Sequence, residues 1–216
     1  MAIQLMTLAG SPYGWRVQLA LEHKELDYEL RILSWQNGEL NTPELRAMSP
    51  RGRVPVVRDG EFTLSESLAI LAYLDHKHPA RPLFGTTAEE TGRIWRWISE
   101  YSSYVDAALE RFIVPIYFGD TKDKAAEIRE AIPKLAGELA TYEKALSATP
   151  FLAGEAPSAA DYAVFPHIMS ILRAANKPMA KGFDLSFLPL GPATTAWIAR
   201  IEGLPRYEKT YPQNWR

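Results

Sequence analysis

The feature that most constrains the fold is the alternation of strand and helix patterns near the N-terminus. A short apolar run, Ala2 to Leu8, is followed by Gly10 and Pro12 and is typical of a buried strand. A helical pattern occupies residues 15–24, and residues 26–33 alternate well enough to form a second strand. This strand–helix–strand order predicts a parallel strand pair joined by a right-handed crossover.

The next fifty residues add a short helix, a hairpin and a second long helix. Residues 43–48 have a short helical pattern, and two strands are expected at 54–58 and 61–64. Asp59-Gly60 between them is a strong hairpin signal, because both turn positions require positive φ. Ser65 is expected to cap the second long helix. The order is therefore β-α-β-(α)-β-β-α.

The rest of the chain has only helical patterns. A stretch rich in proline and glycine, residues 80–87, is the best linker between two domains. The sequence thus predicts an α+β protein, with an α/β domain over 1–79 and an all-helical domain over 88–216. A pocket between two such domains is a common ligand site.

Apolar residues at a spacing of three or four predict long helices in this second part. One is expected over 94–116, kinked or ended by Pro115, and another over 128–146, bent by Pro133. A last helix is bounded by a proline at its start and a glycine at its end, over 192–203.

Composition excludes several classes of function. The 216 residues carry a net charge of −2, without the basic surplus of a nucleic-acid binder. There is no cysteine, so disulfides and thiolate metal sites are excluded, and any thiol chemistry needs a thiol from a ligand. The histidines do not form a metal site, and no nucleotide-binding glycine motif is present. No apolar stretch is long enough to cross a membrane, so a cytoplasmic protein is expected.

Ser11 lies where the first strand ends and the first helix begins. Free amide hydrogens and the helix dipole can stabilise an anion there, and a hydroxyl can donate to it. Position alone is also compatible with an ordinary N-cap serine. Tyr13 offers a second hydroxyl, so the sequence leaves open which of the two would contact the anion.

Two more features suit the binding of a short peptide. The Val54-Pro55 bond can be cis, which would expose the main chain of Val54 for pairing with an extended peptide, and Arg53 can hold a carboxylate. Glu66 and Ser67 begin a helix, where amides and a hydroxyl bind a carboxylate and an acid binds an ammonium. Each feature alone is weak, but together they predict a zwitterionic peptide ligand with a nucleophilic end.

The whole chain resembles the cytosolic glutathione S-transferase superfamily. The segments "SPYGWRVQLAL", "NTPELRAMSPRGRVPVVRDG", "LSESLAILAYLD" and "APSAADYAVFP" stand in that family's order and spacing. The N-terminal motif is similar to serine-type members of the bacterial, tau-like and zeta-like groups. The resemblance implies a thioredoxin-like N-terminal domain, a C-terminal helical domain, a homodimer, and a role in detoxification.

The resemblance also implies roles for individual residues. Glutathione is expected as co-substrate, without metal or nucleotide. Matched to the family's motifs, the residues are Ser11 for the thiolate, Val54 for the cysteinyl main chain, Arg53 for the glycine carboxylate, Glu66 and Ser67 for the γ-glutamyl end, and Ser158 with Asp161 as a structural helix cap.

The expected reaction is conjugation of glutathione to small hydrophobic electrophiles. Their pocket is expected between the domains, with four candidate lining residues, Tyr13, Trp15, Tyr104 and Phe112. Cysteine-type chemistry is disfavoured because Ser11 stands where those classes have cysteine. A glutathione-dependent peroxidase, ether-cleaving or isomerase activity on the same site, or a non-catalytic ligand-binding module of the same fold, remain alternatives.

Overall fold

The computed structural model of the protein describes residues 2–215, and its contacts divide the chain into two compact units. Unit 1 comprises the residues up to Phe84 together with those from Glu202 onward, and unit 2 comprises Gly85–Ile201. The segment after Ile201 therefore groups with the N-terminal residues rather than with the helical unit, which the sequence did not predict.

The part of unit 1 up to Phe84 contains a four-stranded mixed sheet, with the strands and the helices α1, α2 and α3 in the predicted order. The strands lie in the order β2-β1-β3-β4, with β1 and β2 parallel and the other pairs antiparallel. This thioredoxin-like arrangement, together with the helical unit after it, confirms the predicted α+β class. The elements are β1 (Ile3–Leu8), α1 (Pro12–His23), β2 (Tyr28–Leu33), α2 (Pro43–Met48), β3 (Val56–Asp59), β4 (Phe62–Ser65) and α3 (Ser67–Lys77).

The hairpin differs from the prediction at both ends. β3 begins at Val56, two residues later than expected, because Pro55 has no amide hydrogen to donate to the sheet. The prediction that Ser65 caps α3 is wrong: Ser65 is the last residue of β4, and Glu66 occupies the N-cap position without a side-chain capping bond. A hairpin turn joins the two strands as predicted, but it lies one residue later: Asp59 ends β3 and pairs with Phe62, so Gly60 and Glu61 form the turn. Gly60 has a positive φ of 63°, whereas Asp59 keeps its place in the strand.

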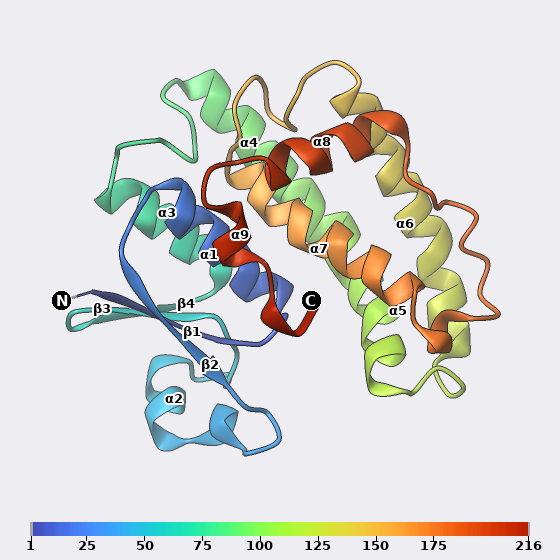
Figure 1. Ribbon diagram of the computed structural model, residues 1–216, viewed down its shortest axis with the longest axis horizontal. Coiled ribbons are helices and arrows are strands. Elements are labelled where there is room, and N and C mark those ends of the chain that lie inside the picture. The colour runs from blue at the N-terminus through green and yellow to red at the C-terminus, as the bar shows by residue number, and fades with distance from the viewer. Residues whose placement is uncertain (1, 216) are drawn as a thin grey trace. The chain divides into compact units, whose positions relative to one another are not determined.

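The helices of unit 1 cover both faces of the sheet. Figure 1 shows α1 and α3 together on one face and α2 on the other. Under α2, an apolar cluster joins it to the sheet through the buried side chains of Met6, Leu33, Leu45 and Val56. Val54 packs against this cluster, so its side chain is held on the α2 face of the sheet.

Unit 2 is built from helices, with α5 packed on α6 and α7, and α4 packed on α7. Its elements are α4 (Ala88–Glu100), a π-helical turn (Tyr101–Val105), α5 (Asp106–Phe118), α6 (Ala125–Leu146), α7 (Ala159–Ala175) and α8 (Pro192–Glu202), whose last residue belongs to unit 1.

The prediction of one regular helix over 94–116 is wrong. A π-helical turn separates α4 from α5 at residues 101–105, and the wider winding of such a turn shifts the apolar face of α5 relative to that of α4. The hydroxyl of Tyr101 donates to Asp106 across this turn at 2.6 Å. Pro115 and Pro133 both lie inside helices without ending them.

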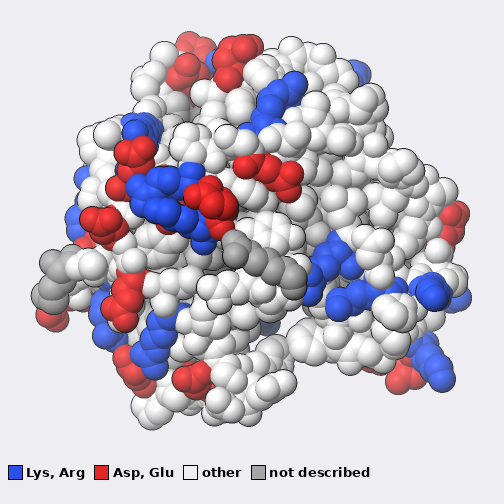
Figure 2. All heavy atoms as spheres, viewed as in Figure 1, with Lys and Arg blue, Asp and Glu red and all other residues white. Residues whose placement is uncertain are grey.

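On the face that Figure 2 shows, basic and acidic side chains lie close to one another on the left, and several basic side chains gather on the right. The net charge of the whole chain is −2. Among the helices of residues 2–215, none is long and apolar enough to cross a membrane.

Candidate functional site

The register of the sheet brings three predicted features to one end of unit 1. In the antiparallel pairs, Val56 lies opposite both Met6 and Ser65. The C-terminal end of β1, the N-terminal end of β3 and the C-terminal end of β4 therefore point the same way. Ser11 follows β1, Val54 and Pro55 precede β3, and Glu66 and Ser67 follow β4. All three features therefore lie at this end of the sheet.

Ser11 is the N-cap of α1, with φ −67° and ψ 121°. Its hydroxyl oxygen accepts the backbone amide of Gly14 at 3.4 Å, and its own amide donates to the carbonyl of Leu8 at 3.2 Å. The two interpretations of Ser11, as a cap and as an anion donor, are compatible, because a serine hydroxyl accepts two bonds and still donates one. The half-buried side chain is thus held among the first amides of α1 with its hydrogen free to donate.

Gly14 explains how the start of α1 lies so close to the sheet. A Cβ at this position would overlap Thr7 of β1, with the Thr7 Cβ only 2.7 Å away. Only glycine allows this approach, so the glycine fixes the distance between β1 and the amides around Ser11.

Tyr13, the rival hydroxyl, is half-buried in the first turn of α1. Its ring lies under the guanidinium of Arg16, with the Arg16 carbon 5.4 Å from the ring centroid. Such a cation–π contact stabilises one position of the ring. Which hydroxyl contacts a bound anion stays a prediction.

The start of α3 has an unusual backbone and a buried cation beside it. Glu66 has φ 70° and ψ 107°, a region that residues other than glycine rarely adopt and that is often found at ligand sites. Its side chain is exposed, whereas Ser67 is buried and accepts a hydrogen bond from Arg16 at 3.0 Å. Arg16 is itself only 2% exposed.

Arg16 is a site residue that the sequence patterns did not reveal. It lies in the run "WRVQLAL", where it is a cation among apolar residues of the first helix. Charged residues are rarely fully buried without a partner, so a cation inside an apolar run is the signal that could have found it. The contact with Ser67 joins residues that are 51 positions apart, which no local pattern predicts.

The third feature lies just before β3. The bond between Val54 and Pro55 is cis. The Val54 side chain packs under α2, and the exposed Arg53 precedes it, with its amide donating to Ser49 Oγ at 3.1 Å. The cis bond and the exposed cation before it therefore lie at the same end of the sheet as Ser11.

The four candidate lining residues occupy different environments. Trp15 is 1% exposed and donates to Thr210 at 2.9 Å, and Phe112 is fully buried, so neither offers a substrate appreciable surface. Tyr104 is 63% exposed. Tyr13 is half-buried beside Arg16, as described above.

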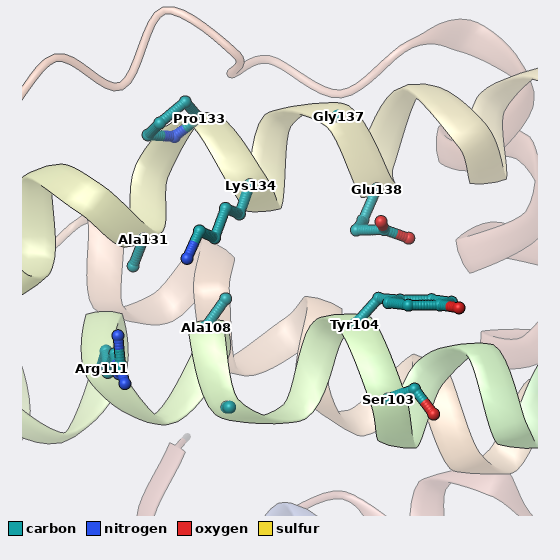
Figure 3. A pocket seen from close by; sticks show the side chains of 10 residues that line it. Ser103, Tyr104, Ala108, Arg111, Ala131, Pro133, Lys134, Gly137 and Glu138 are labelled. Atoms are coloured by element: carbon teal, nitrogen blue, oxygen red, sulfur yellow. The ribbon is translucent and has the colours of Figure 1, made fainter.

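Tyr104 lines a pocket of about 500 Å³ that is formed within unit 2 by α6 and by residues 103–111. In Figure 3, Tyr104 and Glu138 project into the gap between the two helices, and Lys134 reaches across it toward Ala108. Burial and the nearby Glu100 raise the pKa of the Glu138 carboxyl.

Asp161 lies at the start of α7, in unit 2, and is fully buried. One carboxylate oxygen accepts the amide of Leu152 and the indole N–H of Trp197, both at 2.9 Å. The other accepts the amide and hydroxyl of Ser158, at 2.9 and 2.8 Å. Burial raises the pKa of the Asp161 carboxyl, while these four donors oppose that shift.

No group of three or more His, Asp or Glu side chains in residues 2–215 is placed to hold a metal ion. The end of the sheet holds a hydroxyl at a helix start, the cis Val54-Pro55 bond just before β3, and a helix N-terminus with a buried cation beside it.

Comparison with known proteins identifies relatives of this chain. Residues 5–82 match the family model described as glutathione S-transferase, N-terminal domain, and residues 105–205 match the corresponding C-terminal domain. The curated glutathione S-transferase 4 of Zea mays is 34% identical over 179 residues, which cover 81% of this chain and 79% of the relative.

Solved structures are similar over nearly the whole chain. A glutathione S-transferase of Pseudomonas fluorescens is 25% identical with a TM-score of 0.79, covering 95% of this chain and 97% of that one. A glutathione S-transferase-I bound with lactoylglutathione is 26% identical with a TM-score of 0.81, covering 97% and 98%.

Proposed function

Because the chain belongs to the glutathione S-transferase family and is thus a transferase that conjugates glutathione, we propose that Ser11 stabilises the reacting thiolate. The observation that carries this proposal is the position of the Ser11 hydroxyl, at the N-cap of α1 and at the sheet end where Val54 and Ser67 also lie. The substrates are small hydrophobic electrophiles.

The energetics of thiolate formation are within reach of this arrangement. A free thiol has a pKa of about 8.5, and lowering it by about two requires about 2.7 kcal/mol. One hydrogen bond to a charged group contributes about 1.5–3 kcal/mol, and the field of a helix N-terminus about 0.3–1 kcal/mol. The Ser11 hydroxyl supplies the hydrogen bond without losing its own proton, and the start of α1 supplies the field.

The same end of the sheet holds the rest of glutathione. The main chain of Val54 pairs with the cysteinyl residue, and Arg53 attracts the glycine carboxylate. Ser67 and the first amides of α3 bind the γ-glutamyl carboxylate, and Glu66 accepts from its ammonium. The relative that was solved with lactoylglutathione supports a glutathione-derived ligand in this fold.

Arg16 positions Ser67 for this contact. Since the guanidinium donates to Ser67 Oγ, the hydroxyl hydrogen of Ser67 is left to donate to the ligand carboxylate. Hydrogen bonds in such a chain polarise one another, so the bond from Arg16 strengthens the one that Ser67 makes. The buried positive charge also favours an anion at the start of α3.

Turnover and binding assays on one sample test the proposed function. We expect the protein to be retained on immobilised glutathione and to conjugate an aryl halide. Ser11→Ala should keep glutathione binding but lower turnover by about tenfold to a thousandfold, as loss of one stabilising donor does. Unchanged turnover in Ser11→Ala, together with a loss in Tyr13→Phe, would assign the role to Tyr13.

A hydroperoxide assay on the same sample separates conjugation from peroxide reduction, which uses the same thiolate. Failure of the wild-type protein to bind glutathione would favour a non-catalytic module of this fold.

We further propose that the protein is a cytoplasmic homodimer, as the family relationship suggests. The chain mass is 24.3 kDa, so light scattering coupled to size exclusion distinguishes a dimer of twice that mass from a monomer. A mass of one chain at micromolar concentration would contradict this proposal.

A further inference from the structure

The C-terminal segment of the chain returns to the first helix of unit 1. It contains α9 (Tyr207–Thr210) and a 3-10 turn (Gln213–Trp215), drawn in red next to α1 in Figure 1. Arg206, just before α9, places its Nε 2.6 Å from a carboxylate oxygen of Glu22 on α1. Thr210 Oγ1 accepts the indole N–H of Trp15 at 2.9 Å.

Aromatic rings fix the path of this segment over Trp15. Tyr207, Tyr211 and Trp215 recur every four residues, and their ring centroids lie 6.3, 5.8 and 5.2 Å from that of Trp15. Tyr211 and Trp215 meet it edge to face, at 80° and 82°, which is a favourable geometry for aromatic pairs. The Trp15 side chain thus packs against all three rings and fixes the position of the segment on α1.

The end of the segment lies against the two residues that precede Ser11. The Asn214 side-chain amide donates to the carbonyl of Ala9 at 3.4 Å. A Cβ added to Gly10 would meet Trp215 Nε1 at 2.5 Å and the Asn214 side chain at 3.0 Å. Gly10 also has a φ of 73°, so both its backbone and its lack of a side chain allow this close approach.

We propose that Asn214 and Trp215 form one wall of the electrophile site, and that Trp215 determines which groups on the glutathione sulfur are accepted. The proposal rests on the proposed function, since it places the sulfur beside Ser11. Trp215 is only half-buried, unlike Trp15 beneath it, so part of the indole surface is open to a ligand. An indole face beside the sulfur suits apolar, planar or alkyl groups.

Two ligands that differ only at the sulfur test this wall without turnover. Glutathione reports the peptide site, whereas S-hexylglutathione adds an alkyl chain that occupies the electrophile site. Isothermal titration of the full chain gives both dissociation constants for the wild type, Trp215→Ala and Trp215→Phe. Trp95→Ala is a matched control, because Trp95 is also a partly exposed tryptophan but lies in unit 2.

In Trp215→Ala we expect the affinity for glutathione to stay within about twofold of wild type. The affinity for S-hexylglutathione should be about five- to twentyfold weaker, which corresponds to losing the burial of one or two methylene groups of the hexyl chain. Trp215→Phe should lie between, and Trp95→Ala should match the wild type. Equal weakening of both ligands would show a purely structural role and overturn the proposal, as would no change in either.

Should Trp215→Ala fail to fold, judged by its melting temperature, Trp215→Phe and Asn214→Ala carry the same comparison. A wild type that binds neither ligand refutes the proposed function, and the wall with it. If the wild type binds both ligands and the variants keep the wild-type ratio of the two dissociation constants, the proposed role of Trp215 and Asn214 is refuted but the proposed function is not.

Discussion

Replacing Asp161 by alanine tests how the buried start of α7 is stabilised. The substitution removes the acceptor for four buried donors: the amides of Leu152 and Ser158, the Ser158 hydroxyl and the Trp197 indole N–H. The hydroxyl can rotate to another acceptor, which leaves three donors unsatisfied. Each costs about 1–3 kcal/mol, and removing a charge that burial disfavours returns part of that cost.

The net loss in the free energy of unfolding should therefore be about 2–5 kcal/mol, a large share of the total stability of about 5–15 kcal/mol. Asp161→Asn should cost less, about 1–2 kcal/mol, because one oxygen still accepts from Leu152 and Trp197. Asp184→Ala is the control, since Asp184 is exposed and accepts a local bond from Ser186 at 3.0 Å.

Urea unfolding measured by circular dichroism at neutral pH gives these values, and glutathione affinity of the folded variants should be unchanged. A loss below about 1 kcal/mol in Asp161→Ala, comparable to that of an ordinary surface cap, would refute the reasoning, as would an asparagine variant no more stable than the alanine one.

Two further substitutions test unit 1. Arg16→Met should raise the KM for glutathione by about three- to tenfold with a smaller effect on kcat, because Ser67 loses the donor that orients it. Arg16→Lys should restore part of the lost glutathione affinity. Steady-state kinetics measure KM and kcat separately, and an unchanged KM in Arg16→Met would exclude the positioning role. Burial and the neighbouring Lys24 lower the pKa of His23 to about 4 from 6.5. Because the unfolded chain takes up the His23 proton at a higher pH than the folded chain, the free energy of unfolding should fall by at most about 3 kcal/mol as pH drops from about 6.5 to 4. In urea unfolding, His23→Gln should depend less on pH than the wild type. The same pH dependence in both proteins would contradict this prediction.

Local patterns were sufficient to predict most of unit 1. The strand–helix–strand opening and the hairpin turn at Gly60 carry their geometry in a few neighbouring residues, so periodicity and turn chemistry predicted their order, although the turn lies one residue later than expected. The errors arose where backbone detail decides: β3 starts after Pro55, and Glu66 rather than Ser65 occupies the N-cap of α3.

Long-range contacts could not be predicted. The bond between Arg16 and Ser67 and the return of the C-terminal segment onto Trp15 join residues with no shared pattern. The π-helical turn at 101–105 interrupts a stretch whose apolar spacing alone predicts a regular helix. In each case tertiary packing, which a linear pattern does not encode, decides the structure.

The central claim, that the Ser11 hydroxyl makes the thiol of bound glutathione more acidic, is tested most directly by titrating that thiol. Ultraviolet difference spectra of the wild-type complex and of the Ser11→Ala complex monitor thiolate formation with pH. The thiol pKa should lie about two below the free value of about 8.5 in the wild type and return most of the way in Ser11→Ala. A bound thiol that ionises at the same pH as free glutathione, or equally in both proteins, would contradict it.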